Sequence, residues 1–285
     1  MAIEMTSPLK VKGLCKQYPA FRLEDVSFEL VPGSITGFIG RNGAGKTTTI
    51  NSILAFVKPD AGDISFFGME YPEHDREIKE KIGFVSAGMT YYTRKKLKTI
   101  TAVTKTFYPG WDDGAYRKWL NAFSLDEEKT PAELSNGMKI KYALALALSH
   151  GAELMILDEP TSGLDPVSRE ELIEIFLSLR DAGKTILFST HITADLEKCA
   201  DRILFLQKGR LTADSALDEF ANAYRLAECP GALPPQAEKL SLGACRVRDG
   251  YTVLIRREDA SALSLPVRMP TLDEIMIHLD KEDAQ

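Results

Sequence analysis

A short glycine-rich stretch is the first place in this sequence where residue types and spacing suggest chemistry. Residues 40–47 read GRNGAGKT, a phosphate-loop pattern, and they lie between a predicted strand and a predicted helix, as phosphate binding requires. The glycines let backbone N–H groups close around phosphate oxygens, while Lys46 can bridge two phosphates and Thr47 can hold Mg²⁺. The alternative is a tight strand-to-helix turn that needs glycine for its backbone alone.

Two neighbouring acids end an apolar run that is typical of a strand buried on both faces. The run reads AELMILDEP and ends on Asp158 and Glu159. Because successive strand residues point to opposite faces, the two carboxylates have different tasks. One of them can complete the Mg²⁺ shell while the other polarises an attacking water, a division that phosphoryl transfer to water needs. We predict that Asp158 binds the metal, together with Thr47, and that Glu159 acts on the water. Two solvated acids at a strand exit are the alternative.

A histidine and a serine–glycine turn are two further candidates. His191 ends the run KTILFST, at the edge where parallel sheets contact their ligands, although a lone histidine is more often structural. The stretch LSNGMKIK begins an apolar helix and carries Ser135 and Gly137 at its tip. A helix N-terminus with free N–H groups and a serine hydroxyl can bind an anion, whereas a simple serine cap would leave the glycine unexplained.

The elements that must position these groups alternate between strand and helix. The strand SITGFIG and the helix KTTTINSILAFV are followed by the strands KIGFVS, AELMILDEP and KTILFSTH, with the helix SREELIEIFLSLRDAG between the last two. This order predicts an α/β fold with a mostly parallel sheet. Residues from about 9 to 30 alternate apolar and polar positions and predict an antiparallel β subdomain, and residues from about 89 to 150 predict a helical insert.

The C-terminal part of the chain differs in composition. We interpret CPGALPPQ as a proline-rich linker, because helices are hard to continue through proline. The stretch CRVRDGYTVLIRRE predicts a hairpin with an Asp249-Gly250 turn, and TLDEIMIHL predicts a short capped helix. The predicted domains are therefore a core at residues 1–215 and a small α+β appendage at residues 216–285.

Composition restricts the classes of function. With 285 residues the chain can form one large domain and an appendage, and its 44% hydrophobic and 27% charged residues are ordinary for a globular protein. A net charge of -6 gives no general attraction to nucleic acid. The four cysteines show neither zinc spacing nor a disulfide framework, and no run approaches the roughly 18 apolar residues of a membrane span. These features predict a cytoplasmic protein.

Five motifs in a fixed order resemble the ATP-binding cassette of ABC transporters, over about residues 9–215: GRNGAGKT, LSNGM, LMILDEP, SGLD and STH. The resemblance implies a P-loop NTPase core of ABC type and a dimer, in which the signature motif of one chain reaches the γ-phosphate of ATP held by the other. It implies that His191 contacts the γ-phosphate and that Tyr18 stacks on adenine, with a core aromatic as the alternative for Tyr18. The residues implied to bind ATP are Tyr18, Gly40, Arg41, Asn42, Gly43, Ala44, Gly45, Lys46, Thr47, Thr48, the signature residues Ser135 and Gly137, and Asp165 at the dimer seam.

Two positions depart from the family pattern. Asn136 replaces the first glycine of the signature, a mild change because asparagine tolerates unusual backbone angles. The family also expects a glutamine after KIGFVS as a Mg²⁺ ligand and permease sensor, and Ala87 occupies that place. No glutamine occurs between Gln17 and Gln207, so we expect water to replace the missing ligand.

The resemblance leads to a functional hypothesis with two rivals. We predict an ATPase subunit that works as a homodimer or heterodimer, beneath a separate membrane permease at the inner face of the cell membrane; likeness in the segment from LSNGM to PVSR suggests export. A soluble cassette ATPase acting on DNA or ribosomes would need a coiled coil or a second cassette, and neither is seen. Glu159 and His191 argue against a plain nucleotide-binding switch.

A cluster of basic residues lies between Lys81 and Asp112, where the sequence has no acid. We expect it to face the permease or an anionic membrane, and the alternative is a solvated helix face. Its members are Arg94, Lys95, Lys96, Lys98 and Lys105.

Overall fold

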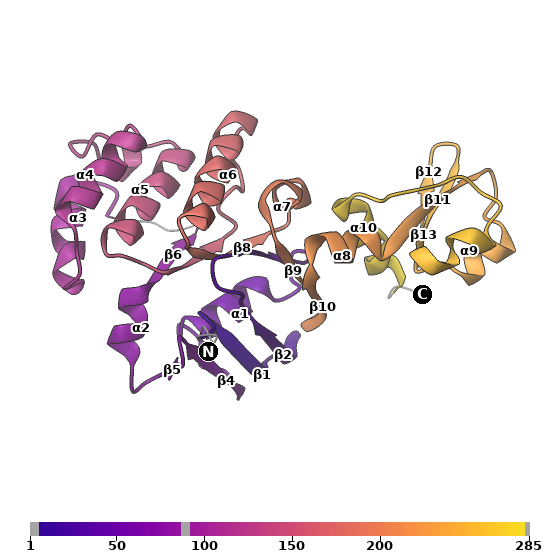
Figure 1. Ribbon diagram of the computed structural model, residues 1–285, viewed down its shortest axis with the longest axis horizontal. Coiled ribbons are helices and arrows are strands. Elements are labelled where there is room, and N and C mark those ends of the chain that lie inside the picture. The colour runs from indigo at the N-terminus through magenta and orange to yellow at the C-terminus, as the bar shows by residue number, and fades with distance from the viewer. Residues whose placement is uncertain (1–5, 87–91, 283–285) are drawn as a thin grey trace, which may run out of the picture.

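A six-stranded sheet is the centre of the computed structural model, which describes residues 6–86 and 92–282 (Figure 1). Its strands are β3 (Ile35–Ile39), β6 (Ile82–Ser86), β7 (Leu154–Asp158), β8 (Thr185–Thr190), β9 (Arg202–Gln207) and β10 (Arg210–Ala216). They lie in the order β10-β9-β3-β8-β7-β6, and every neighbouring pair is parallel except β9 and β10. The predicted α/β fold with a mostly parallel sheet is confirmed.

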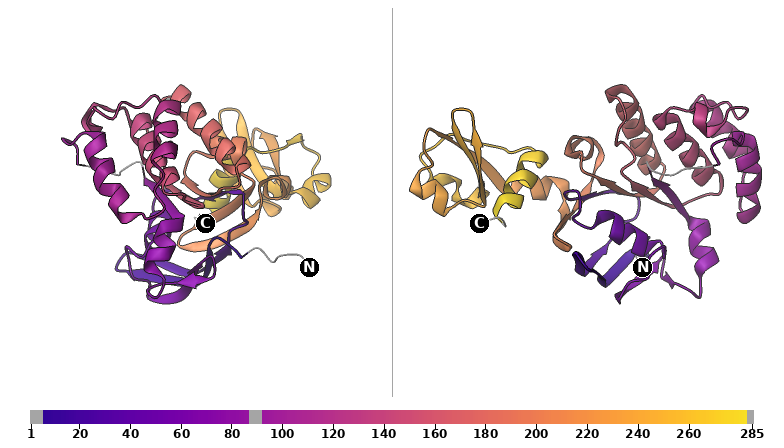
Figure 2. Two further views of the ribbon diagram at one scale, coloured as in Figure 1. Left: turned by 60° about the vertical axis from the view of Figure 1, so that its left-hand side comes forward. Right: turned by 180° about the vertical axis from the view of Figure 1, so that it is seen from behind.

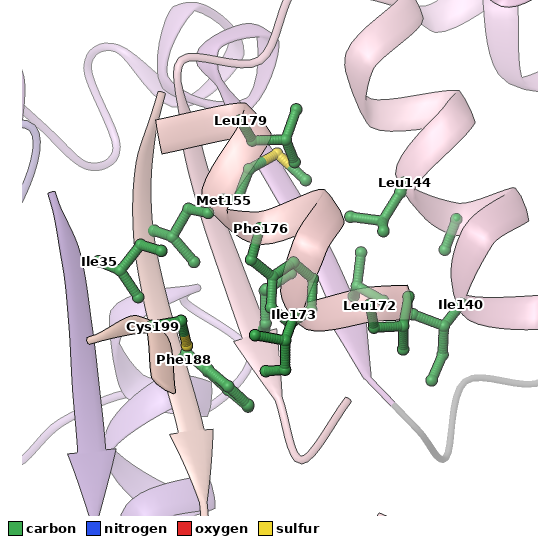
Figure 3. Close-up of a cluster of buried hydrophobic side chains, with 14 of the residues drawn as sticks. Ile35, Ile140, Leu144, Met155, Leu172, Ile173, Phe176, Leu179, Phe188 and Cys199 are labelled. Atoms are coloured by element: carbon green, nitrogen blue, oxygen red, sulfur yellow. The ribbon is translucent and has the colours of Figure 1, made fainter. Parts of the chain in front are cut away.

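The central sheet is covered on both faces, which explains why every residue of its middle strands β3, β7 and β8 is buried. One face packs on helix α1 (Lys46–Ile53) and on an antiparallel sheet of order β2-β1-β4-β5. The antiparallel strands are β1 (Lys10–Tyr18), β2 (Phe21–Glu29), β4 (Ala61–Phe66) and β5 (Met69–Glu70), and helix α2 (Asp75–Lys81) follows them. The other face packs on α5 (Asn136–Ser149), α6 (Pro166–Asp181) and α7 (Thr193–Cys199). In this core the rings of Phe176 and Phe188 lie 5.4 Å apart (Figure 3).

Helices occupy the region of the predicted insert. They are α3 (Leu97–Thr104), η1 (Lys105–Phe107), α4 (Asp113–Ala122), η2 (Pro131–Glu133) and α5. The buried hydroxyl of Thr101 lies 2.8 Å from the Tyr116 hydroxyl and 2.9 Å from the Tyr142 hydroxyl, so hydrogen bonds join α3, α4 and α5. The helices thus form one packed unit beside β6 (Figure 1).

The basic cluster is partly neutralised. Lys96 and Lys98 both pair with Glu128, at 2.8 and 2.5 Å, and Lys105 lies 3.4 Å from Asp113. These acids lie outside the acid-free stretch of sequence, so the stretch alone overstated its positive charge.

The C-terminal part holds a third sheet, of order β12-β13-β11-β14. Its elements are α8 (Leu217–Asn222), β11 (Tyr224–Pro230), α9 (Pro235–Lys239), β12 (Gly243–Val247), β13 (Gly250–Arg256), η3 (Arg257–Ala262), β14 (Val267–Arg268) and α10 (Leu272–Glu282). The proline-rich stretch is not a linker, because it joins β11 to α9 within one packed unit. Cys229 of β11 and Ala237 of α9 belong to the same apolar cluster. The hairpin forms, but Val247 pairs with Gly250, so its turn is Arg248-Asp249.

Helix α10 begins with the predicted cap. The Glu274 amide donates to the Thr271 hydroxyl at 3.2 Å, and the Thr271 amide donates to the Glu274 carboxylate at 2.9 Å, a reciprocal capping box. In residues 6–86 and 92–282, no helix combines the length and the apolar character needed to cross a membrane.

Candidate functional site

The phosphate loop joins β3 to α1, and its backbone can be formed only with glycine at key positions. Gly45 has φ 113°, and a Cβ there would lie 2.6 Å from the Phe21 ring. A Cβ on Gly40 would lie 2.3 Å from the Leu206 carbonyl oxygen. Lys46 begins α1, is 5% exposed, and donates through Nζ to the Gly40 carbonyl at 2.7 Å. The backbone of the loop therefore surrounds the buried ammonium group of Lys46.

Asp158 lies on the α1 side of the central sheet, because β7 alternates its side chains between the two cores. Leu154 and Ile156 belong to the cluster that contains α1, and Asp158 is the next residue in that register. Its Oδ1 accepts a hydrogen bond of 2.6 Å from the Ser189 hydroxyl, and Thr47 also hydrogen-bonds to it. Burial raises the pKa of Asp158, and the hydrogen bond from Ser189 opposes that shift.

Glu159 leaves the strand and points to different partners from Asp158. It has φ 52°, and its amide donates to the Ser189 carbonyl at 3.0 Å, which fixes the turn at the strand end. Its Oε2 lies 2.7 Å from His191 Nδ1, and its Oε1 lies 3.3 Å from Lys46 Nζ. One carboxylate is thus shared by an imidazole and an ammonium group, and it is 21% exposed. This position suits a base that must reach a water molecule.

These groups open into a pocket of about 600 Å³ over the phosphate loop. Ten of the predicted site residues line it: Tyr18, Arg41, Asn42, Gly43, Gly45, Lys46, Thr47, Thr48, Glu159 and His191. Gly40 and Ala44 line neighbouring pockets, and Asp158 is connected to the site by Thr47 and Ser189. Phe21 and Ser162 also line the pocket and were not predicted, although Ser162 falls in the SGLD motif.

Ser135, Gly137 and Asp165 do not line this pocket but lie together elsewhere. Ser135 caps α5 by accepting from the Met138 amide at 3.2 Å, and Asp165 caps α6 by accepting from the Ser168 amide at 3.0 Å. Hydrogen bonds, led by that of the Ser168 hydroxyl, lower the pKa of Asp165. A Cβ on Gly137 would lie 3.6 Å from Ser168, so the two caps are neighbours.

The donor set near the loop fits Mg²⁺ rather than a softer metal. The Asp158 carboxylate and the Thr47 hydroxyl are hard oxygen donors and contact each other. Within residues 6–86 and 92–282, no group of three or more His, Cys, Asp or Glu side chains could hold a metal by itself. A cation here would complete its shell with phosphate oxygens and water. The expected position of the missing glutamine, Ala87, lies outside the described residues.

Asp280 is a further residue that sequence reasoning missed. It lies on α10 and forms an ion pair with Arg41 of the phosphate loop. No motif in the sequence signals this contact, because 239 residues separate the partners.

Comparison with known proteins gives consistent relatives. The family model described as ABC transporter matches residues 23–162. The chain is 32% identical over 203 residues to the ABC transporter ATP-binding protein YtrB of Bacillus subtilis, covering 71% of this chain and 69% of that one. It is 32% identical over 225 residues to the bacitracin transport ATP-binding protein BcrA of Bacillus licheniformis, covering 78% and 74%. It is 32% identical over 301 residues to the Nod factor export ATP-binding protein I of Rhizobium johnstonii, covering 95% and 94%.

Solved structures agree with these relatives. An ATP-binding subunit of an ABC transporter superposes with a TM-score of 0.68 and 32% identity, covering 75% of this chain and 91% of that chain. A cassette dimer in a post-hydrolysis state, bound to ADP and phosphate, has a TM-score of 0.61 and 24% identity, covering 73% and 98%. The latter likeness supports the fold alone.

Proposed function

Because this chain belongs to the ABC transporter family, we propose that it is the ATP-hydrolysing subunit of a bacterial transporter and drives a separate membrane permease in export. Support for export comes from relatives named for bacitracin transport and Nod factor export. On this proposal the subunit works at the inner face of the cell membrane, where its permease holds it. The permease selects the transported molecule.

The arrangement of Glu159, His191 and Lys46 is the observation that carries the ATPase assignment. Bound ATP places its phosphates against the loop amides and Lys46 Nζ, which then exchanges the Gly40 carbonyl for phosphate oxygen. Glu159, which leaves the strand at the pocket, accepts the proton of the attacking water. His191 holds the Glu159 carboxylate through Nδ1 and faces the same pocket.

Thr47 and Asp158 are the residues that would hold Mg²⁺. When bound there, the ion would neutralise part of the charge of the phosphates. Ser189 keeps Asp158 oriented by donating to Oδ1 at 2.6 Å. With alanine at position 87, we propose that water completes the shell.

The signature motif completes the site of a second cassette subunit, on this proposal. Ser135 and Gly137 lie at the N-terminus of α5 and outside the nucleotide pocket of their own chain. The free amides there attract an anion, and ATP held by a partner cassette is such an anion. Homodimer and heterodimer are both compatible with this arrangement.

Replacing Gly137 by aspartate should lower ATP turnover by about tenfold or more, because a carboxylate at the helix N-terminus repels the γ-phosphate. ATP binding to the single subunit should stay near the wild-type value. Gly137→Ala is the matched control for added volume, since its methyl group meets Ser168 only at ordinary contact distance, 3.6 Å. Turnover and binding are measured by phosphate release and by titration with a fluorescent ATP analogue. Full turnover in Gly137→Asp would exclude the signature role.

An apolar pocket beside the helical insert is the surface that we propose for the permease. It measures about 310 Å³ and lies where the ends of α1 and α3 meet β6 and α5. Phe56 lines it while 64% exposed and packs edge-on against Phe84 at 5.7 Å. Thr104 and Tyr108 line the pocket, and the residues before them in the sequence, Val103 and Phe107, have exposed side chains, at 55% and 70%. Exposed apolar groups around a hollow are typical of a protein contact.

Phe56→Asp should therefore reduce co-purification with the permease by about tenfold, because it places a charge in a buried apolar contact. The ATPase activity of the subunit alone should remain that of wild type, since Phe56 does not line the nucleotide pocket. Val247→Asp, at an exposed position of β12, is the control for one added charge. Equal recovery of permease with both variants would exclude this surface.

A further inference from the structure

The C-terminal helix α10 is firmly attached beside the nucleotide site. Its residues Leu272, Ile275 and Met276 are buried in the main apolar cluster, which also contains Leu196 and Cys199 of α7. A hydrogen bond of 2.6 Å from the Leu272 amide to the Glu197 carboxylate adds a second link between α10 and α7. Figures 1 and 2 show α10 at the junction between the C-terminal sheet and the rest of the chain. Its place is therefore set by packing as well as by charge.

From this position α10 forms one wall of a second pocket of about 430 Å³, next to the nucleotide pocket. The opposite wall is formed by the phosphate loop and His191. Arg41, Asn42 and His191 line both pockets. The α10 residues in the wall are Asp273, Met276, Ile277, Asp280 and Lys281. The two pockets thus meet at the side chains that border the phosphate site.

The ion pair between Arg41 and Asp280 connects the two walls. The Arg41 side chain is 72% exposed and that of Asp280 is 21% exposed. A pair this open to solvent contributes little to stability, so its partners exchange readily. ATP bound at the loop is a polyanion, and it competes with the single Asp280 carboxylate for the same guanidinium.

We propose that Asp280 is a positioning residue that holds Arg41 on α10 and away from bound phosphate, so that the C-terminal helix lowers the affinity of the phosphate loop for ATP. The proposal rests on ATP binding at this loop, as argued above. Linkage makes the effect reciprocal: if α10 weakens ATP binding through Arg41, ATP binding loosens the contact of α10 with the loop to the same degree. The C-terminal region thereby acquires a defined role in nucleotide binding.

The decisive experiment compares Asp280→Asn with wild type in the full-length chain. We expect the Kd for ATP and the KM to fall by about threefold, since Arg41 is freed for phosphate, with kcat almost unchanged. Asp273→Asn removes one negative charge from the same helix and pocket, and Asp273 forms no ion pair within residues 6–86 and 92–282, so this variant should leave the Kd at the wild-type value. Asp280→Glu keeps the charge and should restore the wild-type Kd.

A double-mutant cycle tests whether Asp280 acts through Arg41. In an Arg41→Ala background, Asp280→Asn should no longer change the Kd. Amide hydrogen exchange gives a second readout: exchange in residues 272–282 should rise when wild type binds a non-hydrolysable ATP analogue, and should already be high in Asp280→Asn without nucleotide. An unchanged Kd in Asp280→Asn, or an equal gain in the Arg41→Ala background, would overturn the proposal. Failure of wild type itself to bind ATP would instead overturn the proposed function.

Discussion

Glu159→Gln is expected to lose ATP turnover by about 100-fold or more while it still binds ATP, because the amide cannot accept a proton from the attacking water. The change is nearly isosteric, and the glutamine can keep a hydrogen bond with His191, which Glu159 now contacts at 2.7 Å. ATP that binds but is not hydrolysed should hold two subunits together. Phosphate release measures turnover, and size-exclusion chromatography with ATP measures the trapped dimer.

A surface variant provides the comparison for Glu159→Gln. Glu171 lies on α6 and pairs with Lys141 at 2.6 Å, and it does not line the nucleotide pocket. Glu171→Gln makes the same chemical change there and should keep wild-type turnover. If Glu159→Gln also kept turnover within about twofold, Glu159 could not be the general base, because a base usually contributes far more to the rate.

The local parts of the site could be predicted from the sequence because each is encoded in a contiguous stretch. The loop from Gly40 to Thr47 needs a strand before it and a helix after it, and both are visible as apolar patterns. Asp158 and Glu159 are adjacent at the end of a predicted strand, so alternation predicts different directions for them, although in the structure Glu159 has already left the strand with φ 52°. The structure brings these stretches to one pocket because β3, β7 and β8 are parallel and end at the same edge of the sheet.

Contacts that depend on packing between distant stretches could not be predicted. Ser189 reaches Asp158 because the two residues are paired in the register of β7 and β8, which the sequence does not state. Phe21 enters the pocket wall from the antiparallel sheet without any motif of its own. Asp280 meets Arg41 only because α10 packs on α7.

The misreading of CPGALPPQ has a different cause. Proline disfavours helix interiors and central strands, but it is compatible with the ends of elements. Pro230 ends β11 and Pro235 begins α9, so the prolines mark element ends within one packed unit. A high density of prolines therefore indicates the ends of helices and strands, and not the end of a domain.

Lys46→Ala is expected to reduce ATP affinity by about 100-fold. A lysine ammonium near a phosphate oxygen contributes roughly 4 kcal/mol per charge pair at an effective dielectric near 20, and desolvation offsets part of it. Lys46 is 5% exposed, so a cation from solvent cannot readily take its position beneath the loop. Its loss also leaves the Glu159 carboxylate without the ammonium that now lies 3.3 Å away, and that carboxylate then repels the phosphates.

The measurement is a titration of each variant with a fluorescent ATP analogue, after thermal unfolding has shown that the variant is folded. Lys98→Ala removes the same charge from the surface, where Lys98 pairs with Glu128, and should bind ATP like wild type. If Lys46→Ala bound ATP within about threefold of wild type, Lys46 could not be a phosphate-loop lysine that contributes several kcal/mol to ATP binding. The glycines at residues 40–45 would then serve only the tight turn between β3 and α1, which is the alternative that the sequence left open.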